Sequence, residues 1–129
     1  MNHRFVTVWF VAGVAALGFA CSSPEENLAR HLERADAYQE SAQIEKALLE
    51  LQSALKLDPQ STDTNLRIAE LLERNEQFDE ALFYYEEAYR LDPSRDEGAL
   101  GLARLLRIAE PDRATELIDQ VLERNPSSA

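Results

Sequence analysis

The chain has 129 residues, of which 24 are Asp or Glu and 13 are Lys or Arg, and its net charge is −11. This acidic excess argues against nucleic-acid binding and against electrostatic attachment to anionic lipid, because both need clustered basic side chains. A single cysteine excludes an internal disulfide, and the length fits about one domain.

The start of the chain, up to Ala20, differs from the rest. Residues 5–20 carry no charge and are apolar except for Thr7, and they follow a short positive segment that ends at Arg4. Such a segment is typical of an export signal. The apolar run is also shorter than the ~20 residues that span a bilayer comfortably. Residues 1–20 are therefore predicted to be a signal peptide.

The segment Gly18-Phe19-Ala20-Cys21 resembles the lipobox of bacterial lipoproteins, although Gly18 stands where that family prefers Leu. The resemblance implies lipidation of Cys21 by palmitate-type acyl chains. It also implies attachment to the periplasmic side of the outer membrane, because Ser22 is not the Asp that favours inner-membrane retention. Two alternatives are an uncleaved inner-membrane anchor and cleavage after Ala20 to give a soluble periplasmic protein.

Six helices are predicted from the apolar spacing and from end signals. They are expected near residues 24–40, 43–57, 61–75, 78–91, 95–109 and 112–124. Ser23-Pro24-Glu25-Glu26 and Ser94-Arg95-Asp96-Glu97 each predict a capping box at a helix start. Residues 21–27 are expected to be a short leash or helix cap. Because no Gly/Ser tether precedes the first helix, a lipidated Cys21 would hold the helical domain close to the membrane.

The helices form units that repeat at a fixed interval along the chain. Leu57-Asp58-Pro59 returns as Leu91-Asp92-Pro93, and Ala47 returns as Ala81 at the same interval. This interval, with a helix-turn-helix in each unit, resembles the tetratricopeptide repeat family, whose period is about 34 residues. The resemblance implies an all-α solenoid with repeats at 28–61, 62–95 and 96–127, the third shortened by one residue near Glu110-Pro111.

The repeat positions predict a core in which small residues let paired helices approach. These small residues are Ala35, Ala69 and Ala103 on the first helices and Ala47, Ala81 and Ala114 on the second helices. A large apolar residue follows on each second helix, namely Leu51, Tyr85 and Ile118. The last helix is expected to turn polar residues to water, as a terminal repeat does. Alternatively, that end stacks on a second copy or on a partner.

In this family the first helices line a concave groove, and the resemblance implies a partner-binding site there. The expected site contains a leucine series and flanking charges: Leu32, Leu66, Leu100, Asp36, Glu40, Glu70, Glu73, Arg67, Arg74, Arg104 and Arg107. An extended or helical partner segment would meet acidic contacts at one end and basic contacts at the other. The alternative is that the leucines belong to the core and the charges are solvated surface.

Some family members clamp a C-terminal carboxylate with Lys, Asn and Arg side chains. The corresponding positions here are Leu32, Asp36, Arg67, Glu97 and Gly101. Only Arg67 suits an acidic ligand, so this binding mode is not expected.

A second candidate surface is a convex patch of Leu49, Phe83 and Tyr84, since exposed aromatic residues are favoured in interfaces. These rings would otherwise cover the neighbouring repeat.

No enzyme activity, metal or cofactor is expected. His31 is the one histidine after residue 20 and has no Cys or His at ligand spacing. Gly98 and Gly101 lie inside a predicted helix, where they either allow close packing or loosen it, rather than in a phosphate loop. The expected function is a protein-binding adaptor or scaffold of the cell envelope, in assembly of an outer-membrane, pilus or secretion complex. The alternative is a self-associating structural protein of the periplasm.

Overall fold

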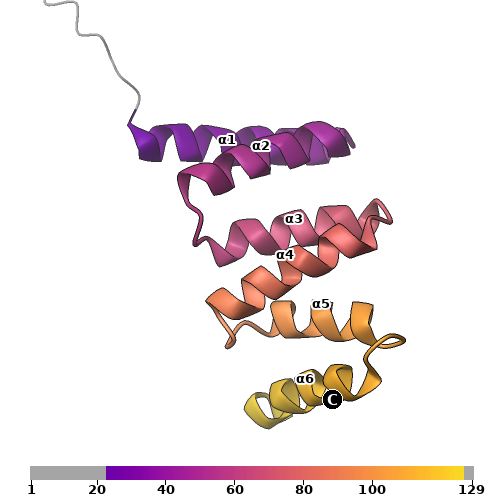
Figure 1. Cartoon of the computed structure of the whole chain (residues 1–129). Coiled ribbons are helices and arrows are strands. Elements are labelled where there is room, and N and C mark those ends of the chain that lie inside the picture. The colour runs from indigo at the N-terminus through magenta and orange to yellow at the C-terminus, as the bar shows by residue number, and fades with distance from the viewer. Residues whose placement is uncertain (1–22, 127–129) are drawn as a thin grey trace, which may run out of the picture.

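The computed structural model of the chain describes residues 23–126. These residues form six helices: α1 (Pro24–Glu40), α2 (Ile44–Leu57), α3 (Thr62–Arg74), α4 (Phe78–Leu91), α5 (Asp96–Leu106) and α6 (Pro111–Arg124). They stack in chain order as three helix-turn-helix pairs, with α1 and α6 at opposite ends (Figure 1). The described part of the chain contains no strand. The predicted all-α solenoid is therefore confirmed.

The start of α1 is the capping box expected from the sequence. The Ser23 hydroxyl accepts a hydrogen bond from the Glu26 amide, and the Ser23 amide donates one to Oε2 of Glu26, each at 3.1 Å. Pro24 occupies the first helical turn, where its missing N–H costs nothing. This start fixes the entry to the helical domain next to the predicted lipidation site, while residues 1–20 and Cys21 themselves lie outside the described residues.

The prediction of a second capping box at Ser94 is wrong. Helix α5 follows Arg95 and has no side-chain cap. Ser94 instead donates two hydrogen bonds to Oδ1 of Asp92, from its amide at 3.0 Å and its hydroxyl at 2.6 Å. The Asp92 side chain therefore holds Ser94 in the turn before α5, so that Ser94 does not cap the helix.

The end of α5 also differs from the expectation, because the helix stops at Leu106 rather than near residue 109. The Glu110 amide still bonds the Leu106 carbonyl at 2.8 Å, but Pro111 follows at once and begins α6. A proline disfavours the helical conformation in the residue before it, so the chain leaves α5 early. The missing residue of the third repeat is therefore accommodated in this turn.

The core consists largely of the expected small residues. All six repeat alanines are buried: Ala35, Ala47, Ala69, Ala81, Ala103 and Ala114. Leu51 and Tyr85 are also buried, but Ile118 at the equivalent position is 41% exposed. The prediction that Ile118 fills the core is wrong, because no described helix lies beyond α6 to cover it. Phe78, which fits the same apolar pattern, is also exposed.

Close packing explains the glycine at residue 101. A Cβ added to Gly101 would overlap the ring of Tyr85, which is only 1% exposed. Tyr85 lies on α4 and Gly101 on α5, so this contact joins the second repeat to the third. Of the two roles considered for this glycine, the structure supports close packing.

Candidate functional site: a groove along the first helices

Three neighbouring pockets lie along the first helices of the repeats. The first pocket, about 400 Å³, is lined by Leu28, Leu32, Asp58, Ser61, Asp63, Thr64, Leu66, Arg67, Glu70, Arg95 and Glu97. The middle pocket, also about 400 Å³, is lined by Glu70, Glu73, Arg74, Tyr85, Glu97, Leu100 and Arg104. The last pocket, about 490 Å³, is lined by Leu100, Ala103, Arg104, Arg107, Pro111, Ala114, Thr115 and Ile118.

The three pockets form one continuous groove. Glu70 and Glu97 line both the first and the middle pocket, and Leu100 and Arg104 line both the middle and the last. The groove thus runs from α1 across α3 and α5 to α6. Of the site residues expected from the sequence, Asp36 and Glu40 line none of these three pockets.

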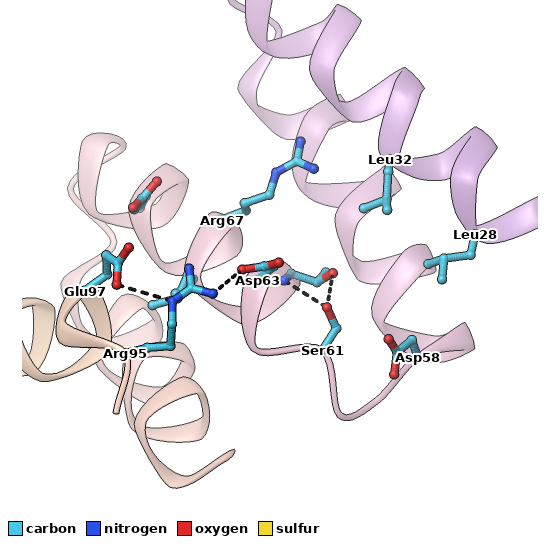
Figure 2. A pocket seen from close by; sticks show the side chains of 11 residues that line it. Leu28, Leu32, Asp58, Ser61, Asp63, Arg67, Arg95 and Glu97 are labelled. Carbon is cyan, nitrogen blue, oxygen red and sulfur yellow. Dashed lines mark hydrogen bonds and ion pairs between the residues drawn. The ribbon is translucent and has the colours of Figure 1, made fainter. Parts of the chain in front are cut away.

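The first pocket has one apolar and one charged side (Figure 2). Leu28 and Leu32 come from α1 and make the apolar side. Opposite them, Nη1 of Arg95 donates to Oδ1 of Asp63 at 2.8 Å, and its Nε donates to Oε2 of Glu97 at 3.3 Å. Sequence reasoning missed Leu28 and Asp63, although Leu28 lies one helical turn before Leu32 and shares its face.

The three leucines of the expected series differ in how exposed their side chains are. Leu66 is 4% exposed and belongs mainly to the core, as the alternative interpretation held, whereas Leu100 is 41% exposed. Leu32 is half-buried and packs against the core. The apolar surface that a ligand can reach therefore lies at the two ends of the series.

Ion pairs between repeats hold several of the expected groove charges. Asp36 pairs with Arg67, Asp63 with Arg95, and Glu73 with Arg104. The pairs Asp36–Arg67 and Glu73–Arg104 each join a carboxylate of one repeat to an arginine of the next, whereas Asp63–Arg95 joins the two ends of the second repeat. Four of the expected groove charges make no ion pair within residues 23–126, and these are Glu40, Glu70, Arg74 and Arg107. The unpaired charges are the ones available to a ligand without breaking an inter-repeat contact.

The most connected cluster lies in the middle pocket. Nε of Arg104 donates to Oε1 of Glu73 at 2.5 Å, and the Tyr85 hydroxyl donates to Oε2 at 2.8 Å. The hydrogen bond from Arg104 lowers the pKa of Glu73 below its usual range, against the opposing effect of burial. Burial, together with the bond to Glu73, raises the pKa of the Tyr85 phenol. The cluster therefore links the second and third repeats through hydrogen bonds between side chains.

Charge changes sign along the groove. The first pocket contains four carboxylates and two arginines. The last pocket is lined by Arg104 and Arg107 and by no acidic residue. A ligand that fills the groove therefore meets a mixed, mostly acidic surface at one end and a basic one at the other.

The convex patch divides into two parts. Leu49 and Phe83 are exposed, but Tyr84 is half-buried and shares a separate pocket of about 440 Å³ with Leu55 and Pro59 of the preceding repeat. Phe83 meets Tyr84 edge to face, with ring centroids 5.2 Å apart. Tyr84 therefore covers the neighbouring repeat, as the alternative interpretation proposed, and Phe83 remains open to solvent.

His31 lies between the first two helices. Its Nδ1 is 2.6 Å from Oε2 of Glu50, and Arg34 approaches the same carboxylate at 3.8 Å.

Among residues 23–126 no group of three or more His, Cys, Asp or Glu side chains is placed to hold a metal ion. No helix in this part of the chain is long and apolar enough to cross a membrane.

Family models for the tetratricopeptide repeat match residues 30–61 and residues 63–105. The chain belongs to the tetratricopeptide repeat family. Among solved structures it is similar to the first TPR of Spaghetti (RPAP3) bound to the HSP90 peptide SRMEEVD. The TM-score is 0.70 at 16% identity, over 79% of this chain and 82% of the other. At this identity the likeness shows a shared fold. None of the curated proteins matches the chain.

Proposed function

We propose that this chain is an adaptor that binds a segment of another protein in the groove along α1, α3 and α5. The observation that carries the proposal is the continuity of three pockets, each open enough to admit side chains of a ligand. A repeat protein that shares this fold has been solved with a bound peptide. A groove of this kind, with apolar surface and a few fixed polar groups, is typical of a peptide-binding site.

The chemistry of the groove favours a different ligand from the acidic HSP90 peptide of the structural neighbour. The one arginine expected at a carboxylate-clamping position, Arg67, is already paired with Asp36. The first pocket adds the carboxylates of Asp58 and Glu70, which make no ion pair within residues 23–126. The favoured segment therefore has apolar side chains for Leu28 and Leu32 and basic groups beside these carboxylates.

A photocrosslinking amino acid tests this assignment. Placed at Leu32, in the first pocket, or at Leu100, between the middle and last pockets, it should crosslink a partner in cells. Placed at Leu49, which is exposed on α2, it serves as the matched control. Crosslinks from Leu49 alone would move the binding surface to the convex side, and crosslinks from none of the three positions would refute the adaptor role.

We further propose that the adaptor works in the cell envelope, anchored by a lipid on Cys21, in assembly of an outer-membrane, pilus or secretion complex. The capped start of α1 at Pro24 comes only three residues after Cys21 in the sequence, which supports a domain held close to the membrane. The intact mass of membrane-extracted protein, beside a Cys21→Ala variant, tests the anchor. Loss of residues 1–20 with a gain of acyl chains is the expected result. An uncleaved mass would favour an inner-membrane anchor, and a cleaved, unmodified mass a soluble periplasmic protein.

A further inference from the structure

The last pocket of the groove has an apolar floor and a basic edge. Leu100 and Ala103 of α5 and Ala114 and Ile118 of α6 contribute the apolar surface. Arg107 lies at the edge, is exposed, and makes no ion pair within residues 23–126. No described element covers this surface.

The preceding repeat shows what kind of element fits there. Ile118 occupies the repeat position of Tyr85, which lies four residues after the buried Ala81 as Ile118 lies four after Ala114. Tyr85 is 1% exposed because Gly101 of α5 lies against its ring, whereas Ile118 is 41% exposed. In the second repeat the equivalent place is occupied by α5, whose Gly101 lies against Tyr85. The last pocket is therefore the place where an equivalent helix would pack, with a small residue over Ile118.

The charges at this place are reversed relative to the preceding repeat. There, Glu73 of α3 receives two hydrogen bonds from Arg104 of α5, at 2.5 and 2.6 Å. The position equivalent to Glu73 in the third repeat holds Arg107. A helix with an arginine at the place of Arg104 would meet a like charge, which is unfavourable, and one with a carboxylate would form a pair. The unpaired Arg107 thus favours a helix that carries a carboxylate at this position.

We propose that the α5–α6 end of the groove docks an amphipathic helix of a partner protein that carries a Gly or Ala over Ile118 and a carboxylate opposite Arg107. The inference rests on the proposed adaptor function and specifies the chemistry of the partner at the basic end. The partner helix takes the place that α5 takes on the second repeat. It covers the exposed side chain of Ile118 and neutralises Arg107.

A second copy of the chain fits this surface less well. In a head-to-tail stack, α1 would lie on α6 and place Asp36 opposite Arg107. However, the α1 residues equivalent to Gly101 and Leu102 are Glu33 and Arg34, both exposed and charged. They would set charges against the apolar floor, where α5 places a glycine and a buried leucine. The outer face of α1 thus suits solvent rather than this pocket.

A peptide derived from α5 supplies the probe. It comprises residues 95–110 with Arg104→Glu, is labelled with a fluorophore and is held helical by a staple on its outer face, since short helices are marginal in water. Its matched control is the same peptide with the native arginine. Fluorescence anisotropy with the full-length chain should show the glutamate peptide binding about tenfold more tightly than the arginine peptide.

Variants of the chain make the test specific. Arg107→Glu should reverse the preference between the two peptides. Lys46→Glu, the same charge change at an exposed residue of α2 that lines none of the three groove pockets, should leave the preference as it is. Equal binding of both peptides, binding of neither, or a preference that survives Arg107→Glu would overturn the proposal. Circular dichroism of each variant confirms that the helices remain folded.

Sedimentation equilibrium tests the remaining alternative, in which a second copy of the chain occupies this surface. Growth in mass with concentration that Ile118→Glu abolishes would assign this surface to a second copy, and overturn docking of a partner helix. Failure of the peptide test while a photocrosslinker at Leu32 still captures a partner would refute this inference alone. Loss of crosslinks at both Leu32 and Leu100 would refute the proposed function.

Discussion

The ring of Tyr85 lies directly against Gly101, and no larger residue fits between α4 and α5 at this point. The ring cannot move aside easily, because it is buried and its hydroxyl is bonded to Glu73. The contact belongs to the continuous core that joins the second and third repeats, in which Ala88, Ala99 and Leu102 are also buried. A small increase in volume at residue 101 therefore strains the packing of α5 on α4.

Gly101→Ala should lower the free energy of unfolding by about 1–3 kcal/mol, the usual cost of overpacking a core. The loss occurs although alanine is the better helix former by about 1 kcal/mol in a helix interior. Urea denaturation followed by circular dichroism measures the change. In a Tyr85→Leu background the same substitution should cost much less, because the ring is gone. A stabilised Gly101→Ala variant would show that α5 shifts freely on α4.

Acid should weaken the tie between the second and third repeats through Glu73. Its pKa in the folded chain lies below the ordinary value of 4.5, first because Arg104 donates to it. The unfolded chain then binds the proton more readily, so this contribution is fully present above about pH 4.5 and is lost as the pH falls through the lowered pKa. Glu73→Gln should reduce the slope of unfolding free energy against pH in that window.

The control for this experiment is Glu116→Gln, which alters an exposed α6 carboxylate with no ion pair within residues 23–126. Part of the slope should remain in both variants, because the pKa values of Asp92 and Glu87 are also lowered, by hydrogen bonds from Ser94 and Arg90 respectively. Equal slopes for Glu73→Gln and the unmodified chain would show that the Arg104 contact does not persist in solution.

The turns inside the first two repeats hold strained residues. Ala42 has a φ of 56° and Glu76 a φ of 61°, in the left-handed region that favours glycine. Ala42→Gly and Glu76→Gly should each stabilise the chain by about 0.5–1 kcal/mol, since the relief of strain exceeds the entropy that glycine adds to the unfolded chain. Thermal unfolding gives the comparison. Ser41→Gly, at a neighbouring φ of −91°, should destabilise instead.

Sequence reasoning located the repeats and their small core residues because the repeat period constrains both. It failed where a repeat has no neighbour or loses a residue. Ile118 follows the core pattern but has no described helix to cover it, and α5 ends early because Pro111 follows the shortened turn. Exposure at a repeat position depends on what lies beyond it, and that information is not in the position itself.

The candidate groove was predicted in outline, but its charges were not. Arg67 and Arg104 appear in the sequence as free groove residues, and the structure pairs them with Asp36 and Glu73 of the preceding repeats. Partners that lie on successive repeats cannot be recognised from local helical spacing. The period alone therefore locates a groove residue without showing whether its charge is available to a ligand.

The two leucines Leu66 and Leu100 separate core from groove in one comparison. They occupy the same repeat position, but Leu66 is 4% exposed and Leu100 is 41% exposed. Leu66→Glu places a carboxylate in the core and should lower the free energy of unfolding by at least about 3 kcal/mol, because a buried charge without a partner is strongly destabilising.

Leu100→Glu can turn its carboxylate to water and should change the unfolding free energy by less than about 1 kcal/mol. It should nevertheless weaken binding in the groove, since it adds a charge where two pockets meet. Urea titrations of both variants, beside partner crosslinking from Leu32 in the Leu100→Glu background, test the two claims. A folded Leu66→Glu variant would place that leucine in the ligand surface, and undiminished crosslinking with Leu100→Glu would confine the ligand to the first pocket.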